Sequence, residues 1–413
     1  MMEELVQKAE ADCQEQFAKV DKIAEKNQER LLQAFHEKRV SDGHFNSTTG
    51  YGYDDTGREV LEAVYAKVFG GESGLVRPQI VSGTHAISTA LFGILRPGEE
   101  LLYITGTPYD TLEEVIGIRG ENSGSLIDFG ILYNEVDLKG DGLPDFDRIR
   151  QAIRPETKVI GIQRSKGYRD RPSFTIKQIA EMVRFVKEIK EDLIVFVDNC
   201  YGEFVEDQEP LHVGADLIAG SLIKNPGGGL VRAGGYIVGS EKLVNQCANR
   251  LTAPGLGKEA GATFNMLQEM FQGFFLAPHV VSQALKGAIF TSRLLELAGF
   301  ETSPKYNAER TDLIQSVTFG DSERMISFCQ AIQLHSPVNS YFAPVPSAMP
   351  GYEDEVIMAA GTFIQGSSIE LSADGPLRPP YIAFVQGGLT YEHVKIAVRN
   401  ATEKLLIPQN GTF

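Results

Sequence analysis

The segment Leu193-Ile194-Val195-Phe196-Val197-Asp198 decides the fold that the sequence predicts. Five consecutive apolar residues that end at a carboxylate are typical of a parallel strand buried on both faces. Residues 217–223 form a second short apolar segment, which ends at Lys224. Segments with the hydrophobic periodicity of a helix alternate with short apolar segments of this kind. The alternation predicts an α/β protein whose mostly parallel sheet carries helices on both faces.

The same alternation continues along the chain on both sides of these strands. An amphipathic pattern over residues 3–38 predicts one long helix ahead of the sheet. Residues 41–58 are rich in Gly, Ser, Thr, Asn and Asp and predict an irregular loop. The other expected helices cover residues 86–95, 110–118, 176–189 and about 280–297, and the other expected strands cover 101–105, 158–162 and 236–238.

These patterns divide the 413 residues into three parts. Residues 1–47 form an N-terminal helical arm, which must bury its apolar stripe on the body of the protein or on a partner subunit. Residues 48–280 form the large domain with the parallel sheet. Residues 281–413 form a smaller α+β C-terminal domain.

Composition excludes several classes of function. The chain has 39 basic and 55 acidic residues and a formal net charge of -16, which argues against binding to nucleic acid or anionic membranes. No apolar run approaches the roughly 20 residues that cross a bilayer, and the N-terminus shows no secretory signal, so we expect a cytoplasmic protein. The four cysteines are widely scattered, so we expect free thiols and no metal site.

Polar groups at the strand ends indicate where chemistry takes place, because open parallel sheets bind ligands there. Gly83-Thr84-His85 opens a helix, whose first N–H groups favour an anion. Asp198 follows a buried strand and needs a cationic partner. Lys224 also ends an apolar strand, where burial would lower its pKa and suit it to form a Schiff base. The alternative is a purely structural pair between Asp198 and Lys224.

Motifs of other enzyme classes are missing from the sequence. There is no GxxxxGK[ST] and no GxGxxG, which argues against a P-loop and a dinucleotide fold. There is no GxSxG elbow of a hydrolase and no HExxH of a metalloprotease.

A set of motifs in a fixed order resembles the fold-type I enzymes that depend on pyridoxal 5'-phosphate (PLP). The resemblance is strongest to the trans-sulfuration group, and within it to the branch of methionine gamma-lyase-like or aluminium-resistance proteins. It implies an α/β fold with a mostly parallel seven-stranded sheet in a PLP-binding large domain. The motifs of the fold-type I enzymes are Tyr51-Gly52-Tyr53, Ser82-Gly83-Thr84-His85, Tyr109, Val197-Asp198-Asn199 and Ser221-Leu222-Ile223-Lys224. The resemblance to the branch comes from residues 50–58, 162–168 and 367–376.

The resemblance assigns roles to the residues at the strand ends. Lys224 would hold PLP covalently and move protons during the reaction, and Asp198 would pair with the pyridinium nitrogen. Tyr109 would stack on the cofactor ring. Tyr53 would reach the phosphate of the neighbouring subunit, so the active sites would be shared within a homodimer. Gly83, Thr84, His85 and Ser221 complete the expected cofactor site.

The chain departs from the family at the substrate and phosphate contacts. Asp55 stands where the family has a second cross-interface arginine. Either Arg58 substitutes for that arginine or the phosphate is held differently. The family motif for the substrate carboxylate is not preserved, and Arg378 is our candidate for that role. The other candidate substrate contacts are Ser367, Ser368, Gln163, Arg164 and Ser165.

The resemblance implies a carbon–sulfur lyase that acts on a sulfur amino acid. An elimination of the methionine gamma-lyase or cystathionine beta-lyase type would give a keto acid, ammonia and a thiol. One alternative is a PLP aminotransferase, or a PLP lyase acting on a non-sulfur amino acid. Another is an acidic protein that binds aluminium without catalysis. The expected partners are an amino-acid substrate and further copies of the chain, as a homodimer and, as is common among relatives, a homotetramer.

Overall fold

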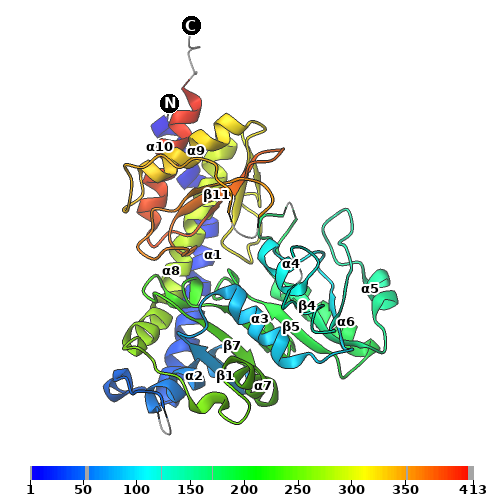
Figure 1. The fold of residues 1–413 in the computed structure, drawn as a ribbon. Coiled ribbons are helices and arrows are strands. Elements are labelled where there is room, and N and C mark those ends of the chain that lie inside the picture. The colour runs from blue at the N-terminus through cyan, green and yellow to red at the C-terminus, as the bar shows by residue number, and fades with distance from the viewer. Residues whose placement is uncertain (1, 52–54, 122, 170, 350–351, 408–413) are drawn as a thin grey trace.

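The structure of the protein, a computed structural model, describes residues 2–51, 55–121, 123–169, 171–349 and 352–407. Its main sheet has seven strands in the order β1-β7-β6-β5-β4-β2-β3 (Figure 1). Among the described strands, β7 alone runs opposite to the other six, so the mostly parallel seven-stranded sheet is confirmed. The strands are β1 (Ser73–Arg77), β2 (Glu100–Tyr103), β3 (Leu132–Glu135), β4 (Thr157–Gln163), β5 (Ile194–Asp198), β6 (Leu217–Ser221) and β7 (Gly235–Gly239).

Helices cover both faces of this sheet, because its side chains alternate between two apolar cores. On β5, Val195 and Val197 belong to one core and Phe196 to the other. The first core is shared with α1, α2, α6 and α8, and the second with α3, α4 and α7. The α-helices of this part of the chain are α1 (Met2–Glu37), α2 (Thr56–Phe69), α3 (Gly83–Ile94), α4 (Asp110–Ile116), α5 (Phe146–Ala152), α6 (Ile176–Ile189), α7 (Glu241–Leu251) and α8 (Leu267–Leu297).

The long helices α1 and α8 lie side by side and connect the main sheet with a second, smaller sheet (Figure 1). The helix predicted over residues 3–38 is confirmed by α1. The other long helix begins well before the predicted start near 280, because Gly273 and Pro278 have low helix propensity, yet both are buried in α8. The boundary at residue 280 falls inside α8, and the division into domains therefore stays a proposal.

The smaller sheet is antiparallel, with the order β10-β11-β12-β9-β8. The helices α9 and α10 share its apolar core with the first turns of α1 and the last turns of α8 (Figure 1). This part of the chain has the α+β character that the sequence predicted. Its elements are β8 (Glu301–Ser303), β9 (Gln315–Thr318), α9 (Ser322–Leu334), β10 (Val356–Ala359), β11 (Ser372–Pro376), β12 (Ile382–Gln386) and α10 (Tyr391–Leu406).

Local signals explain where several helices begin. Ser82 caps α3 by accepting a hydrogen bond from the His85 N–H at 3.0 Å. Asp55 caps α2 in the same way, because its Oδ1 accepts a hydrogen bond from the Arg58 N–H at 3.0 Å. This aspartate therefore has a structural role. The short 3₁₀ helices are η1 (Asp42–Phe45), η2 (Pro210–Val213), η3 (Asn225–Gly227) and η4 (Gly257–Glu259). No helix in the described ranges is long and apolar enough to cross a membrane.

Candidate active site

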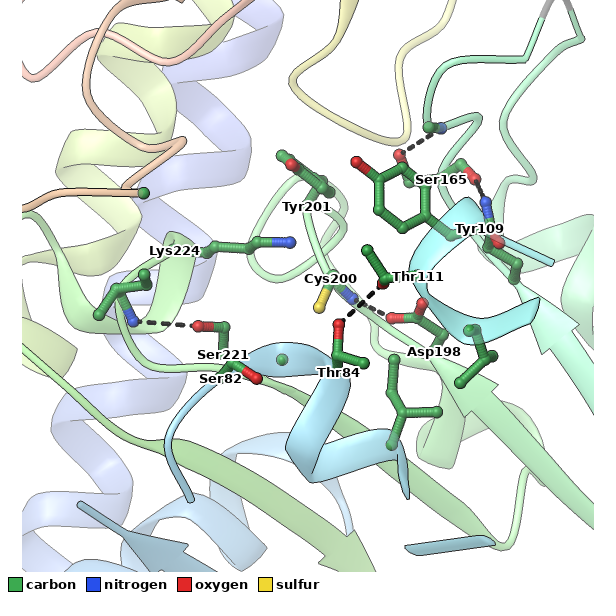
Figure 2. A pocket seen from close by; sticks show the side chains of 17 residues that line it. Ser82, Thr84, Tyr109, Thr111, Ser165, Asp198, Cys200, Tyr201, Ser221 and Lys224 are labelled. Atoms are coloured by element: carbon green, nitrogen blue, oxygen red, sulfur yellow. Dashed lines mark hydrogen bonds between the residues drawn. The ribbon is translucent and has the colours of Figure 1, made fainter. Parts of the chain in front are cut away.

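A cavity of about 300 Å³ opens at the carboxyl ends of β4, β5 and β6, beside the first turns of α3 and α4 (Figure 2). We call it the main cavity. It lies where a parallel sheet was expected to bind its ligand. The predicted site residues that line it are Gly83, Thr84, Tyr109, Gln163, Ser165, Asp198, Ser221 and Lys224.

Lys224 extends into the main cavity from the turn that follows β6 (Figure 2). Its Nζ lies 4.0 Å from the ring centroid of Tyr201, which places the ammonium over an aromatic face. Burial is the largest single influence on the pKa of Lys224 and lowers it, because burial disfavours the charged amine. The acidic groups Cys200, Tyr201, Asp198 and Glu203 nevertheless raise its pKa above the usual range. The sequence had predicted a lowered pKa from burial. It indicated Asp198 as a possible partner, but not Cys200, Tyr201 and Glu203.

Asp198 ends β5 with its carboxylate buried at the wall of the main cavity. Its Oδ1 accepts a hydrogen bond from the Cys200 N–H at 3.1 Å (Figure 2). Burial raises the pKa of Asp198, and the charge of Lys224 opposes that rise. A buried carboxylate of this kind is stabilised by a cationic ligand, and Asp198 is therefore suited to bind a positively charged ring nitrogen.

The first turn of α3 borders the main cavity with donors suited to an anion. The first intrahelical bond runs from the Ala86 N–H to the Ser82 carbonyl at 3.0 Å. The N–H groups of Gly83 and Thr84 come before it, where no intrahelical carbonyl is within reach. A Cβ atom at Gly83 would lie 3.3 Å from the Cys200 Sγ, so glycine keeps this approach open.

Other contacts complete the anion-binding side of the cavity. Ser221 presents its hydroxyl at the end of β6 and accepts a weak bond from the Ile223 N–H at 3.4 Å. The hydroxyl oxygens of Thr84 and Thr111 lie 2.9 Å apart and link α3 to α4. His85 instead accepts a hydrogen bond from the Val81 N–H through Nδ1, at 3.1 Å.

Tyr109 forms the wall opposite Lys224 (Figure 2). Its hydroxyl shares a short hydrogen bond with that of Tyr352, which comes from the loop before β10. Burial raises the pKa of Tyr109 well above its usual value, so the phenol keeps its proton. The ring packs against Gly167, where a Cβ would lie 2.9 Å from Cδ2.

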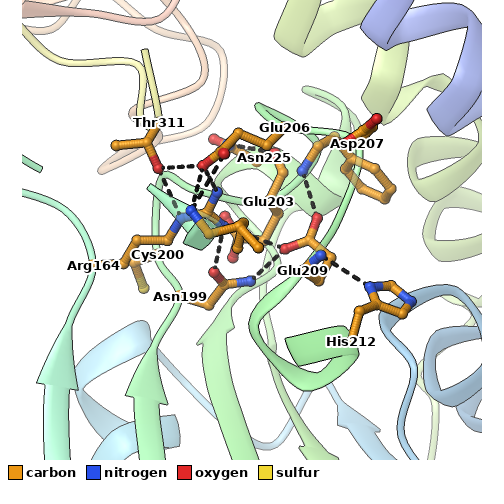
Figure 3. Close-up of polar contacts among 12 residues, drawn as sticks. Arg164, Asn199, Cys200, Glu203, Glu206, Asp207, Glu209, His212, Asn225 and Thr311 are labelled. Atoms are coloured by element: carbon orange, nitrogen blue, oxygen red, sulfur yellow. Dashed lines mark hydrogen bonds and ion pairs between the residues drawn. The ribbon is translucent and has the colours of Figure 1, made fainter. Parts of the chain in front are cut away.

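The segment at residues 163–165 divides between two environments. Gln163 and Ser165 line the main cavity. Arg164 lies in a buried cluster behind Asp198, where it contacts Asn199 Oδ1 at 2.8 Å, Glu206 at 3.0 Å and Glu209 at 3.4 Å (Figure 3). This cluster fixes the loop that follows β5, and Arg164 thus acts on the site through its scaffold.

The remaining candidates lie at the edge of the site or outside the described residues. Arg378 forms an ion pair with Asp354 at 3.0 Å and lines a neighbouring cavity. Ser367 and Ser368 are buried next to Gly366, which lines the main cavity. Tyr53 falls outside the described residues. Arg58 is buried and donates to the Gly261 carbonyl at 3.0 Å.

A family model described as methionine gamma-lyase matches residues 2–406. The chain belongs to this family. It is 65% identical over 410 residues to the uncharacterized protein YnbB of Bacillus subtilis, a match that covers 99% of this chain and 97% of YnbB.

Solved structures agree with this membership of the methionine gamma-lyase family. A carbon-sulfur lyase involved in aluminum resistance from Clostridium novyi is 51% identical, with a TM-score of 0.94 and coverage of 98% of this chain and 96% of that one. The metY protein of Campylobacter jejuni, solved with a pyridoxyl-lysine phosphate, has a TM-score of 0.58 at 16% identity. The match covers 85% of this chain and 86% of that one. That likeness shows the fold alone, which is fold type I.

PLP is the cofactor of the methionine gamma-lyase family, and the residues of the main cavity fit it. Asp198 offers a buried carboxylate for the ring nitrogen, and the first turn of α3 offers donors for the phosphate. In the described part of the chain, Gln163 Oε1 and Ser367 Oγ are buried without a hydrogen-bond partner. Such unpaired groups are expected where a polar ligand binds.

The sequence did not indicate Cys200, Tyr201 and Thr111, which also line the main cavity. Cys200 and Tyr201 come two and three residues after Asp198, and their place after a buried strand was the available signal. Thr111 lies two residues after Tyr109 at the start of α4. Tyr201 has a positive φ of 71°, a backbone conformation that no local sequence pattern predicts for tyrosine.

Proposed function

We propose that the protein is a PLP-dependent carbon–sulfur lyase that eliminates a thiol from a sulfur amino acid. The observation that carries this proposal is the meeting of Lys224 and Asp198 in one buried cavity, beside the first turn of α3. The overall reaction consumes one water and yields a thiol, a keto acid and ammonia. Whether the β or the γ carbon loses sulfur depends on the substrate.

The chain offers a residue for each part of the cofactor. Lys224 would bind the aldehyde carbon, Asp198 would bind the ring nitrogen, and Tyr109 would pack on the ring. Gly83 and Thr84 would donate backbone N–H groups to the phosphate, together with the Ser221 hydroxyl. When bound, PLP supplies an electron sink for the negative charge that forms at the substrate Cα.

Three residues carry the chemistry that the protein itself performs. Lys224 Nζ removes the proton from the substrate Cα and returns a proton later in the reaction. Asp198 keeps a proton on the ring nitrogen through its negative charge. Tyr109 keeps its phenolic proton because burial raises its pKa, and it donates that proton to the departing sulfur. The burial of the site limits competing reactions with water.

The test combines a visible spectrum with a panel of amino acids. The purified protein is expected to show the absorption band of lysine-bound PLP, and Lys224→Ala is expected to abolish it. Lys242→Ala, at an exposed position of α7, is the matched control and should keep the band. A sulfur amino acid should release thiol and keto acid in equal amounts. Transfer of the amino group to an added keto acid, without thiol release, would contradict the proposal.

We also propose that two copies of the chain share their active sites. Tyr53 is assigned to the neighbouring subunit's phosphate, and a tetramer would be a pair of such dimers. The proposed parts of each chain remain the arm at 1–47, the large domain at 48–280 and the small domain at 281–413. Mass photometry at several protein concentrations measures the assembly directly.

A further inference from the structure

The hydroxyl of Tyr109 has one hydrogen-bond partner among the described residues, the hydroxyl of Tyr352. Tyr109 directly precedes α4, whereas Tyr352 lies in the loop before β10, far along the chain. Either hydroxyl can donate in this bond, because each carries one proton and lone pairs that accept another. When Tyr109 directs its proton into the main cavity, its oxygen can therefore still accept the proton of Tyr352.

The two tyrosines border different cavities. Of the pair, Tyr109 lines the main cavity, and Tyr352 lines a second cavity of about 160 Å³. The second cavity is also lined by three arginines and by four carboxylates, those of Asp110, Glu113, Glu353 and Asp354. A cavity of this size and polarity is suited to hold water. The two hydroxyls therefore connect the main cavity with a place where water can exchange protons.

Aromatic packing holds Tyr352 at this position. Its ring centroid lies 6.3 Å from that of Tyr109 in an edge-to-face arrangement, and 5.8 Å from that of Tyr168. Tyr168 in turn packs on Phe384 of β12, with ring centroids 5.1 Å apart, and is hydrogen-bonded to the buried Asp374. The hydroxyl of Tyr352 is therefore held at that of Tyr109 by rings from both parts of the chain.

The acidities of the two phenols favour a proton on Tyr109. Burial raises the pKa of Tyr352 to about 12, with smaller contributions from Tyr201, Asp374 and Asp110. The hydrogen bond between the two hydroxyls lowers the pKa of Tyr352 but raises that of Tyr109. A Tyr109 that has lost its proton is therefore expected to recover one from Tyr352.

We propose that Tyr352 is a positioning residue that returns a proton to Tyr109 after each elimination. This inference rests on the proposed function, in which the Tyr109 hydroxyl gives its proton to the departing sulfur. The Tyr109 O–H bond breaks as the S–H bond forms, and the Tyr352 O–H bond then breaks as that of Tyr109 forms again. Water in the second cavity returns a proton to Tyr352, and bulk solvent neutralises the hydroxide that remains. The proton of the thiol thus comes from solvent, although the main cavity limits the entry of water.

The test compares two leaving groups on the same carbon. A thiol needs a proton as it leaves, whereas chloride leaves as a stable anion and needs none. The sulfur amino acid is the one that the unmodified protein cleaves in the panel above. Its partner is 3-chloroalanine where sulfur leaves the β carbon, or 2-amino-4-chlorobutyrate where sulfur leaves the γ carbon. Release of thiol or chloride is measured on the PLP-loaded protein.

Tyr352→Phe keeps the ring and removes the hydroxyl. We expect kcat for thiol release to fall about 10- to 100-fold, at the lower end of what a general acid contributes, because Tyr109 itself remains. The KM and the release of chloride should stay nearly unchanged. Because Tyr352 acts through Tyr109, the double variant Tyr109→Phe/Tyr352→Phe should be no slower than Tyr109→Phe. Tyr341→Phe, at an exposed position, is the matched control and should change neither rate.

Two further measurements do not depend on turnover. The visible band of lysine-bound PLP should persist in Tyr352→Phe, which separates the loss of a proton donor from the loss of the cofactor. In denaturant, the shifts in midpoint of Tyr109→Phe and Tyr352→Phe should not add in the double variant, because each single change breaks the same hydrogen bond. Additive shifts would contradict the contact between the two hydroxyls.

Other results would also overturn the proposal. An unchanged kcat for thiol release in Tyr352→Phe would show that Tyr109 recovers its proton by another route. Equal losses for thiol and chloride would mean that Tyr352 only shapes the site. Failure of the proposed function looks different, because the unmodified protein would then release no thiol from any sulfur amino acid, and the proposal would be overturned with it.

Discussion

The Nζ atom of Lys224 lies 4.0 Å from the ring centroid of Tyr201, and both side chains line the main cavity. The aromatic face attracts the ammonium and restricts where the flexible lysine side chain points. Tyr201 itself is held with a φ of 71°, a conformation that costs free energy in any residue with a side chain. The surrounding fold therefore maintains this backbone, and the ring keeps Lys224 directed at the site of reaction.

Replacing the ring should slow the reaction without preventing cofactor binding. Tyr201→Leu removes the aromatic face, worth about 0.5–2 kcal/mol for a desolvated cation, which corresponds to a fall in kcat of about 2- to 30-fold. The visible band of lysine-bound PLP should remain. Tyr201→Phe is the control, because it keeps the ring and loses only the hydroxyl. If both variants were equally slow, the hydroxyl rather than the ring would be responsible.

Asp198 is expected to affect the rate far more than the fold. Asp198→Asn keeps the shape of the side chain and removes the negative charge that holds a proton on the ring nitrogen. We expect kcat to fall by about 100-fold or more, as is typical when a charge-stabilising group is lost. Circular dichroism and the content of bound PLP should stay close to those of the unmodified protein. Normal turnover in Asp198→Asn would show that the carboxylate has a structural role alone.

The sequence predicted those parts of the fold in which periodicity is strong. Residues 3–38 and 176–189 carry long amphipathic patterns, and the structure has helices there. The strands β1 and β3 were not predicted, because each is short and lacks a continuous apolar run. Helix propensity also gave the wrong start for α8. Tertiary packing of its first half outweighs the low helix propensity of the buried Pro278.

Site residues that lie at the end of a strand could be predicted from the sequence. The sequence was less informative where the direction of the side chain determines whether a residue reaches the main cavity. Asp198 and Lys224 reach the main cavity because the carboxyl ends of neighbouring strands share one edge of the sheet. Arg164 follows such a strand too, yet it turns into the buried cluster with Glu206 and Glu209. Tyr352 meets Tyr109 across 243 residues of sequence, a contact that no local pattern reveals.

The buried cluster behind Asp198 should contribute strongly to stability. Arg164 is buried with Glu209 and is also paired with Glu206 (Figure 3). Arg164→Met removes the cation that both carboxylates share and leaves Glu209 with Arg30 at 3.9 Å. Breaking a buried pair of this kind typically costs about 3–5 kcal/mol. Denaturant unfolding should show a lower midpoint. The double variant Arg164→Met/Glu209→Gln is the control and should recover part of the loss, because one uncompensated charge is removed.

Glu203 should make the protein less stable as the pH rises. Burial, with a smaller effect of Glu209, raises the pKa of Glu203 from 4.5 to about 8, although Tyr236 donates a hydrogen bond to it at 2.7 Å. The folded state therefore keeps a proton that the unfolded chain releases near pH 4.5. This contribution is complete below about pH 4.5 and is lost as the pH rises toward 8.

A variant that cannot titrate isolates this contribution. Glu203→Gln should flatten the decline of melting temperature between about pH 5 and pH 8, relative to the unmodified protein, because each unit of pKa shift is worth about 1.4 kcal/mol. Asp374, whose pKa burial raises to about 6, adds its own decline in both proteins and cancels in the comparison. Parallel curves for the two proteins would mean that Glu203 is charged in the folded state at neutral pH.

A mixing experiment tests whether two subunits share each active site. Lys224→Ala and Tyr53→Phe should each be inactive or nearly so, through loss of the reactive amine and of the cross-subunit phosphate contact. Refolding the two variants together gives hybrids in about half of the dimers, and one of the two sites in each hybrid is intact. About a quarter of the original activity should therefore return. A mixture as inactive as its parents would place both residues in the site of a single chain.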